Sequence, residues 1–195
     1  WQATVGPAHF GSDVHGKTLG IVGMGNIGAA VARRGRFGFN MPILYSGNSR
    51  KTALEQELGA QFRSLDQLLA EADFVVIVVP LSDATRKLIS SRELKLMKPS
   101  AFLINIARGP VVDEAALIEA LQNGTLRGAG LDVYEKEPLS DSPLFKLPNA
   151  LTLPHIGSAT AETREAMANR AIDNLRAALL GERPRDLVNP QVWKG

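Results

Sequence analysis

The stretch from Lys17 to Gly28, K-T-L-G-I-V-G-M-G-N-I-G, limits the possible folds of this 195-residue chain more than any other. Residues 18–22 are apolar and partly β-branched, which predicts a buried parallel strand. Glycines follow at positions 23, 25 and 28 in the spacing G-x-G-x-x-G, and a helix is expected over residues 27–36. Because the glycines leave a strand and open a helix, the pattern predicts a dinucleotide-binding turn.

Each glycine of this turn has its own predicted role. Gly23 permits the tight turn out of the strand, Gly25 lets the backbone approach a pyrophosphate, and Gly28 lets the helix lie close to the sheet. The helix N-terminus then faces the phosphates. The alternative is a glycine-rich turn that binds nothing, and the rest of the chain argues against it. The buried face of the helix is predicted to comprise Ile27, Ala30, Val31 and Ala32.

Composition excludes several classes of protein. The chain is 45% hydrophobic and 22% charged, which suffices for one good-sized core. Its net charge of +2 comes without any long basic run, so nucleic-acid binding is not indicated. The absence of cysteine excludes disulfides and thiolate metal sites, no metal is expected, and a cytoplasmic location is compatible. No apolar run reaches the roughly 18–20 residues of a membrane span, and no signal peptide is visible.

Strands and helices alternate along the rest of the chain. This alternation predicts an α/β fold with a doubly wound, Rossmann-type parallel sheet covered on both faces. Ser64 and Gln67 form a capping box, while Gly59, Gly124 and Gly181 mark helix ends. Further strands are predicted over residues 42–45, 74–79, 101–106, 127–133 and 150–153, and helices over 52–58, 64–72, 90–97, 113–121 and 160–180.

The loop after the second strand indicates which dinucleotide is bound. An NAD site usually has an acid there, about 20 residues beyond the glycines, that accepts from the adenosine ribose hydroxyls. In this chain no acid appears before Glu55, and two cations are present instead. The missing acid and the two cations are independent signs that the cofactor is NADP(H), although NAD(H) is possible. The alternative is a solvated turn that binds no phosphate. The donors suited to a 2′-phosphate are Ser46, Asn48, Ser49, Arg50 and Lys51.

Three groups with complementary chemistry follow successive predicted strands. Arg108 can fork onto a carboxylate or polarise a carbonyl, and His155 can exchange a proton near neutral pH. A carboxylate such as Glu137 can orient a histidine ring and favour its protonated form. Because the carboxyl ends of parallel strands face one crevice, these three residues are the candidate catalytic groups.

The chain resembles the cofactor domain of D-isomer-specific 2-hydroxyacid dehydrogenases. The stretches that carry the resemblance are H-G-K-T-L-G-I-V-G-M-G-N-I-G, V-V-P-L, L-I-N-I-A-R-G-P-V-V-D, G-A-G-L-D-V-Y-E-K-E-P and L-P-H-I-G-S-A-T, which cover nearly all of residues 14–180 in family order. The loop from Ser46 to Arg50 looks most like that of the NADPH-preferring glyoxylate/hydroxypyruvate and 2-ketogluconate reductases of this family.

The resemblance implies an oxidoreductase that reduces a small 2-oxo acid, of the glyoxylate, hydroxypyruvate or 2-ketogluconate type, to the D-2-hydroxy acid. It implies that Arg108 binds and polarises the 2-oxo acid, that His155 is the acid/base with Glu137 as its partner, and that the protein pairs as a homodimer through this domain. The predicted cofactor contacts are Gly23, Met24, Gly25, Asn26, Ile27, Gly28, Ser46, Asn48, Ser49, Arg50, Val79, Pro80, Ile106, Ala107, Arg108, Asp132, His155 and Gly157.

Members of this family also have a substrate domain, for which this chain has little room. Only thirteen residues precede Val14, and a domain of ordinary size has ~100 or more. We therefore expect a linker over residues 1–13, a dinucleotide-binding domain over 14–180, and a segment over 181–195 that returns toward a substrate domain. Such a chain is expected to bind cofactor without catalysing. The alternative function is that of a dinucleotide-sensing interaction protein, such as the corepressors that share this fold.

Overall fold

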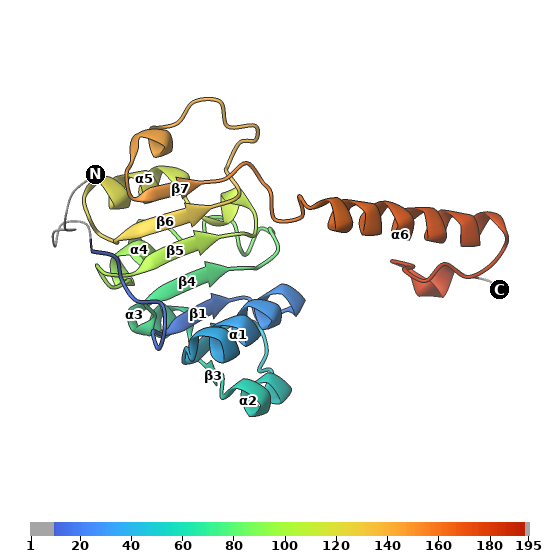
Figure 1. Ribbon diagram of the computed structural model, residues 1–195, viewed down its shortest axis with the longest axis horizontal. Helices are drawn as coiled ribbons and strands as arrows, with labels where there is room; N and C mark the ends of the chain where they lie inside the picture. The colour runs from blue at the N-terminus through green and yellow to red at the C-terminus, as the bar shows by residue number, and fades with distance from the viewer. Residues whose placement is uncertain (1–9, 194–195) are drawn as a thin grey trace, which may run out of the picture. The chain divides into compact units, whose positions relative to one another are not determined.

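The computed structural model describes residues 10–193 and has a seven-stranded sheet at its centre (Figure 1). The strand order is β3-β2-β1-β4-β5-β6-β7, and all neighbouring pairs are parallel. The doubly wound α/β fold predicted from the sequence is therefore confirmed. The strands are β1 (Leu19–Val22), β2 (Ile43–Ser46), β3 (Gln61–Phe62), β4 (Phe74–Ile77), β5 (Phe102–Asn105), β6 (Gly128–Leu131) and β7 (Ala150–Thr152).

The helices follow the predicted segments closely. Ser64 and Gln67 form the expected capping box, and Asp113 and Thr160 each accept a hydrogen bond from a backbone N–H in the first turn of the helix that follows. The α-helices are α1 (Asn26–Phe39), α2 (Thr52–Leu58), α3 (Leu65–Glu71), α4 (Ser91–Leu96), α5 (Glu114–Gln122) and α6 (Ala161–Leu179). Short 3-10 helices are η2 (Gly109–Val111), η3 (Pro143–Lys146) and η4 (Pro190–Val192).

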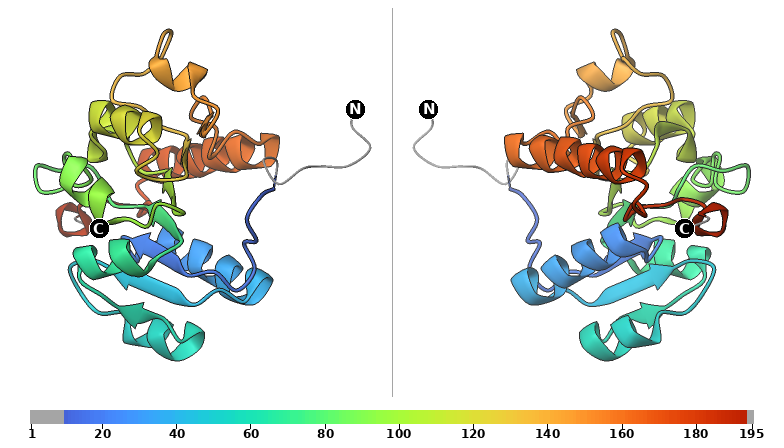
Figure 2. Two further views of the ribbon diagram at one scale, coloured as in Figure 1. Left: turned by 90° about the vertical axis from the view of Figure 1, so that its left-hand side faces the viewer. Right: turned by 90° about the vertical axis from the view of Figure 1, so that its right-hand side faces the viewer.

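Two apolar layers pack against opposite faces of the sheet. Leu68 of α3, Leu94 of α4 and Leu117 of α5 belong to one layer, together with inward side chains of β1, β4 and β5. Ala32 of α1 and Leu58 of α2 belong to the other layer. In Figure 2 the blue α1 accordingly lies on one side of the sheet, and the green-to-yellow α3, α4 and α5 lie on the other. Both faces of β1 and β4 are thus covered, as a parallel sheet requires.

Two details of the sequence-based prediction were wrong or incomplete. Ile27 was predicted to face the core, but it is 63% exposed, because α1 turns Gly28, Ala29, Ala32 and Gly35 toward the sheet instead. Ala30 and Val31 are only partly buried. The two-residue edge strand β3 was not predicted, since both of its side chains are exposed and no apolar run marks it.

The carboxyl ends of six strands lie in register along one edge of the sheet. Val22 pairs with both Ser46 and Ile77, and Asn105 pairs with both Ile77 and Leu131. Leu131 in turn pairs with Thr152 at the end of β7. Every loop that leaves these strands therefore starts from the same edge, and this edge is where the candidate residues of the sequence are concentrated.

The chain divides after Pro154 into two compact units. The second unit contains α6, none of whose residues is buried. The segment that follows the helix turns back along it and is held to it by Asp186. The carboxylate of Asp186 accepts from Arg170 Nη2 at 2.6 Å and from Asn174 Nδ2 at 2.7 Å. Arg170 and Asn174 lower the pKa of Asp186 to about 2. Residues 10–14 have no regular structure, while the rest of the linker predicted over 1–13 lies outside the described residues.

Candidate cofactor and active site

The glycine turn after β1 has the geometry that its sequence predicts. Gly23 has a φ of 104°, a conformation that favours glycine, and its N–H donates to Ser46 O at 2.9 Å. A Cβ added to Gly28 would lie 2.3 Å from Gly23 O, so only glycine lets α1 start this close to the turn. A Cβ on Gly25 would meet nothing within 4 Å. The open space above Gly25, at the start of α1, fits a pyrophosphate against the helix N-terminus.

A cavity of about 570 Å³ opens beside this turn. It lies at the reversal of strand order between β1 and β4, which is the ligand-binding position of open α/β sheets. Among the described residues that line it, Lys51 carries the only charged side chain. Of the predicted cofactor contacts, the lining includes Gly23, Met24, Gly25, Ser46, Asn48, Ser49, Val79 and Pro80.

The loop after β4 also lines the cavity, although it was not among the predicted contacts. Thr85 Oγ1 donates to Pro80 O at 2.7 Å and accepts from Ser82 N at 2.8 Å. These bonds fold the loop back, so that Ser82, Ala84 and Thr85 line the cavity. A Ser-x-x-Thr spacing after a strand-ending proline was the available signal for this turn.

The loop after β2 is organised around the buried hydroxyl of Tyr45. This side chain is 0% exposed; its hydroxyl donates to Glu55 Oε1 at 2.5 Å and accepts from Lys51 N at 2.7 Å. Glu55 also accepts from Arg50, at 3.0 Å from Nε and 2.6 Å from Nη2. Hydrogen bonds from Arg50 and Tyr45 lower the pKa of Glu55, so the carboxylate is ionised at neutral pH. Arg50, predicted as a cofactor contact, is thus already paired.

Arg108 lies on a tight turn beyond β5. The buried Asn105 spans this turn: its Oδ1 accepts from Ala107 N at 3.1 Å, and its Nδ2 donates to Arg108 O at 3.2 Å. Arg108 Nη1 donates to Ala107 O at 2.6 Å. Ile106 is 37% exposed at the sheet edge, whereas Ala107 is buried. Asn105 was not among the predicted site residues, although it lies within the quoted stretch L-I-N-I-A-R-G-P.

The turn that carries Arg108 packs against the turn that carries Glu137. A Cβ on Gly109 would lie 1.8 Å from the carbonyl carbon of Tyr134, so the two backbones touch there. Glu137 Oε1 accepts from Tyr134 N at 3.0 Å, and the peptide bond from Glu137 to Pro138 is cis. The Tyr134 hydroxyl donates to Leu153 O at 2.8 Å. Two of the three candidate catalytic residues therefore lie on joined turns at the carboxyl edge.

The remaining predicted residues are distributed as follows. Asp132 is buried directly after β6, and its N–H donates to Asn105 O at 3.1 Å. Asn26 lines a second cleft, of about 440 Å³, together with Met24, Gly25 and Lys51. His155, which has a φ of 53°, and Gly157 begin the second unit of the chain.

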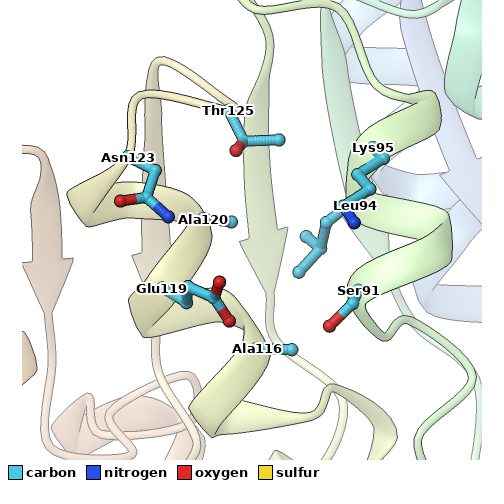
Figure 3. Close-up of a pocket in the computed structure, with 8 residues that line it drawn as sticks. All are labelled: Ser91, Leu94, Lys95, Ala116, Glu119, Ala120, Asn123 and Thr125. Carbon is cyan, nitrogen blue, oxygen red and sulfur yellow. The ribbon is translucent and has the colours of Figure 1, made fainter.

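A separate cleft of about 120 Å³ lies between α4 and α5 (Figure 3). Leu94 of α4 points toward Ala116 and Ala120 of α5, and the polar side chains of Ser91 and Glu119 border the opening. No predicted site residue lines this cleft. It therefore does not belong to the candidate site.

Comparison with known proteins identifies the family. Residues 1–157 match the model of the D-isomer specific 2-hydroxyacid dehydrogenase, NAD binding domain. The chain belongs to this family. It is 57% identical over 195 residues to glyoxylate/hydroxypyruvate reductase B of Serratia proteamaculans, a match that covers 100% of this chain and 60% of the relative. The D-2-hydroxyacid dehydrogenase resemblance predicted from the sequence is confirmed.

Solved structures of similar sequence have this fold. A protein from Thermus thermophilus superposes with a TM-score of 0.89 at 46% identity, over 96% of this chain and 58% of the other. A glyoxylate reductase from Paecilomyes thermophila superposes with a TM-score of 0.84 at 43% identity, over 93% and 55%. The chain thus spans about 60% of the length of these relatives.

Membership in this D-2-hydroxyacid dehydrogenase family settles the class of cofactor. The NAD-binding domain of the family takes a nicotinamide dinucleotide, and the glycine turn and the cavity beside it fit one. Across residues 10–193, no group of three or more His, Asp or Glu side chains is placed to hold a metal ion. Within that range, no helix has the length and apolar character needed to cross a membrane.

Proposed function

We propose that the whole protein is an NAD(P)-dependent reductase that converts a small 2-oxo acid to the D-2-hydroxy acid. The observation that carries this proposal is the contact between the turn of Arg108 and the turn of Glu137 at the carboxyl edge of the sheet. Its relatives named glyoxylate/hydroxypyruvate reductase B support glyoxylate or hydroxypyruvate as the substrate, and a 2-ketogluconate-type acid is the further candidate.

The roles of the side chains follow from their chemistry. Arg108 offers a planar fork of N–H donors, which binds a substrate carboxylate and polarises the neighbouring 2-oxo group. His155 supplies the proton that the carbonyl oxygen takes up, and Glu137 is the carboxylate that orients the imidazole. The bound nicotinamide supplies the hydride. The side chain of Asn105 holds the backbone of Arg108, so the arginine side chain extends from a fixed position.

We propose further that NADP(H) is preferred over NAD(H). The first turn beyond β2 contains no acid that could accept from the ribose hydroxyls, and Glu55 is already engaged by Tyr45 and Arg50. Ser46, Asn48 and Ser49 line the cavity with small donors. Of the other predicted contacts, Gly23, Met24, Gly25, Val79 and Pro80 line the same cavity. We assign Ile106, Ala107, Asp132 and Gly157 to the cofactor site on the family resemblance alone.

We also propose that the protein forms a homodimer through this domain. Large apolar side chains stay exposed on the first unit, among them Phe37 at 69% and Phe39 at 48%. Burial of such side chains against a second copy would be favourable. Analytical ultracentrifugation of the chain measures its association state directly, and a sedimentation coefficient of a monomer at all concentrations would exclude the dimer.

One experiment tests the proposed reaction. NADPH oxidation by the whole protein is measured with glyoxylate, hydroxypyruvate and 2-ketogluconate, and the present chain is measured in parallel. We expect turnover with at least one acid for the whole protein. For the chain alone we expect cofactor binding without turnover, because reaction requires a substrate held within about an ångström and shielded from water. A whole protein that binds NADPH but reduces none of these acids would favour the corepressor-like alternative.

A further inference from the structure

Three cations surround the cofactor loop that follows β2, and two of them are already neutralised. Arg33 of α1 donates to both carboxylate oxygens of Glu57, at 2.6 Å and 2.7 Å. Arg50 donates to both oxygens of Glu55, at 3.0 Å and 2.6 Å. Both acids belong to α2. A phosphate that approached either arginine would have to displace a bidentate carboxylate or accept its repulsion at short range.

Lys51 differs from both arginines. In the part of the chain that the structure describes, no carboxylate forms an ion pair with its ammonium group. Lys51 lines the 570 Å³ cavity, whereas Arg50 does not, and it also lines the adjoining 440 Å³ cleft beside Met24 and Gly25. The lysine therefore borders both spaces that meet at the glycine turn, with its charge available.

The backbone of Lys51 is fixed by a buried group. Its N–H donates at 2.7 Å to the hydroxyl of Tyr45, which is 0% exposed and donates onward to Glu55. Burial and the bond to Glu55 raise the pKa of Tyr45, so the hydroxyl keeps its proton and the chain of bonds persists at neutral pH. Glu55 thus holds Arg50 and Tyr45 together, and Tyr45 sets where the lysine side chain begins.

We propose that Lys51 is the residue that selects a 2′-phosphorylated cofactor, while Arg50 and Glu55 form a clamp that positions the loop. This inference rests on the proposed preference for NADP(H) and assigns its main determinant to Lys51. A lysine suits this role because its ammonium is a point charge on a flexible stem, which reaches a phosphate from either side of the loop.

Isothermal titration of the chain with two nucleotides tests the assignment without the nicotinamide. Adenosine 2′,5′-bisphosphate carries the 2′-phosphate, and 5′-AMP is the matched ligand that lacks it. Because Lys51→Ala removes a charge-assisted contact, it should lower the affinity for the bisphosphate by about tenfold. The affinity for 5′-AMP should fall by less than about twofold. Lys51→Arg, the control that keeps the charge, should retain most of the bisphosphate affinity. Arg50→Ala should lower the affinity for the bisphosphate by less than about threefold.

The possible outcomes separate this inference from the proposed cofactor preference. If the wild-type chain binds the two nucleotides equally, the NADP(H) preference itself is wrong. If it prefers the bisphosphate and Lys51→Ala keeps that preference, only the assignment of Lys51 is wrong. A selective loss in Arg50→Ala would show that Arg50 leaves Glu55 to bind the phosphate. Equal weakening of both nucleotides by Lys51→Ala would assign the lysine a structural role and overturn the inference, and circular dichroism melting checks that each variant is folded.

Discussion

The buried side chain of Asn105 closes the turn that presents Arg108. Its Nδ2 donates to Arg108 O at 3.2 Å, and its Oδ1 accepts from Ala107 N at 3.1 Å, so one amide satisfies both sides of the turn. Asn105 is the last residue of β5 and is 1% exposed. A residue of the sheet therefore holds the backbone of Arg108, the candidate substrate-binding residue, in place.

The first prediction follows from this amide. Asn105→Ala leaves the buried Ala107 N–H without its acceptor, which should lower the free energy of unfolding by about 1–3 kcal/mol. Urea denaturation of the chain at neutral pH measures the change. Ser90→Ala, which removes a partly buried hydroxyl bonded to Glu93 just before α4, provides a comparison of expected smaller effect. A change below about 0.5 kcal/mol in Asn105→Ala would mean that the turn does not depend on this side chain.

Two glycine substitutions should have opposite effects on folding and binding. A Cβ on Gly25 meets nothing within 4 Å, so Gly25→Ala should fold normally but weaken NADPH and NADH alike by about tenfold or more, because it occupies the approach to the pyrophosphate. Gly28→Ala should instead destabilise the chain by about 1–3 kcal/mol, since its Cβ would lie 2.3 Å from Gly23 O. Thermal melting and cofactor fluorescence distinguish the two effects. Unchanged cofactor affinity in Gly25→Ala would place the pyrophosphate elsewhere.

Arg108 should be essential for the reaction and nearly dispensable for folding. Arg108→Lys keeps the charge but loses the planar fork, so kcat/KM of the whole protein with its 2-oxo acid should fall by about a hundredfold or more. Steady-state kinetics give this value, and titration with NADPH provides the control, with affinity expected within about threefold of the wild type. An unchanged kcat/KM would remove Arg108 from the substrate site.

Stability in acid should depend on Asp73. Burial raises the pKa of Asp73, but hydrogen bonds from Lys98 Nζ and Thr18 N, each at 2.9 Å, outweigh it, and the pKa lies below its usual value. A carboxyl whose pKa is lowered by folding stabilises the protein above the unfolded pKa, and this contribution is lost as pH falls through the folded pKa.

Removal of Lys98, the ion-pair partner of Asp73, should change how the free energy of unfolding depends on pH. Lys98→Gln raises the folded pKa of Asp73 toward the unfolded value, so it should lower the unfolding free energy at neutral pH by about 0.5–1 kcal/mol. The variant should then lose less stability than the wild type between about pH 5 and pH 3. Urea denaturation across this range tests the sign. If Lys98→Gln lost more stability than the wild type as the pH falls, the proposed contribution of the Asp73–Lys98 pair would be wrong.

Local patterns in the sequence predicted most of the fold. Apolar runs, capping residues and terminal glycines placed the helices and six of the seven strands, because these signals act within a few residues. The glycine spacing likewise predicted the turn at Gly23 and the close start of α1. Periodicity did not predict β3, whose two exposed residues form a strand only because the edge of β2 is available to pair with them.

The sequence by itself determined the element order, the dinucleotide-binding turn and the family, since each depends on short spacings along the chain. The tertiary structure decided which charges remain available. Arg50 and Lys51 are neighbours and both are basic, yet Glu55 on α2 engages one of them and the buried hydroxyl of Tyr45 fixes the backbone of the other. The structure likewise joined the turns of Arg108 and Glu137, because the register of β5 and β6 brings their ends together. Pairings of this kind depend on the relative placement of whole elements, which no local pattern encodes.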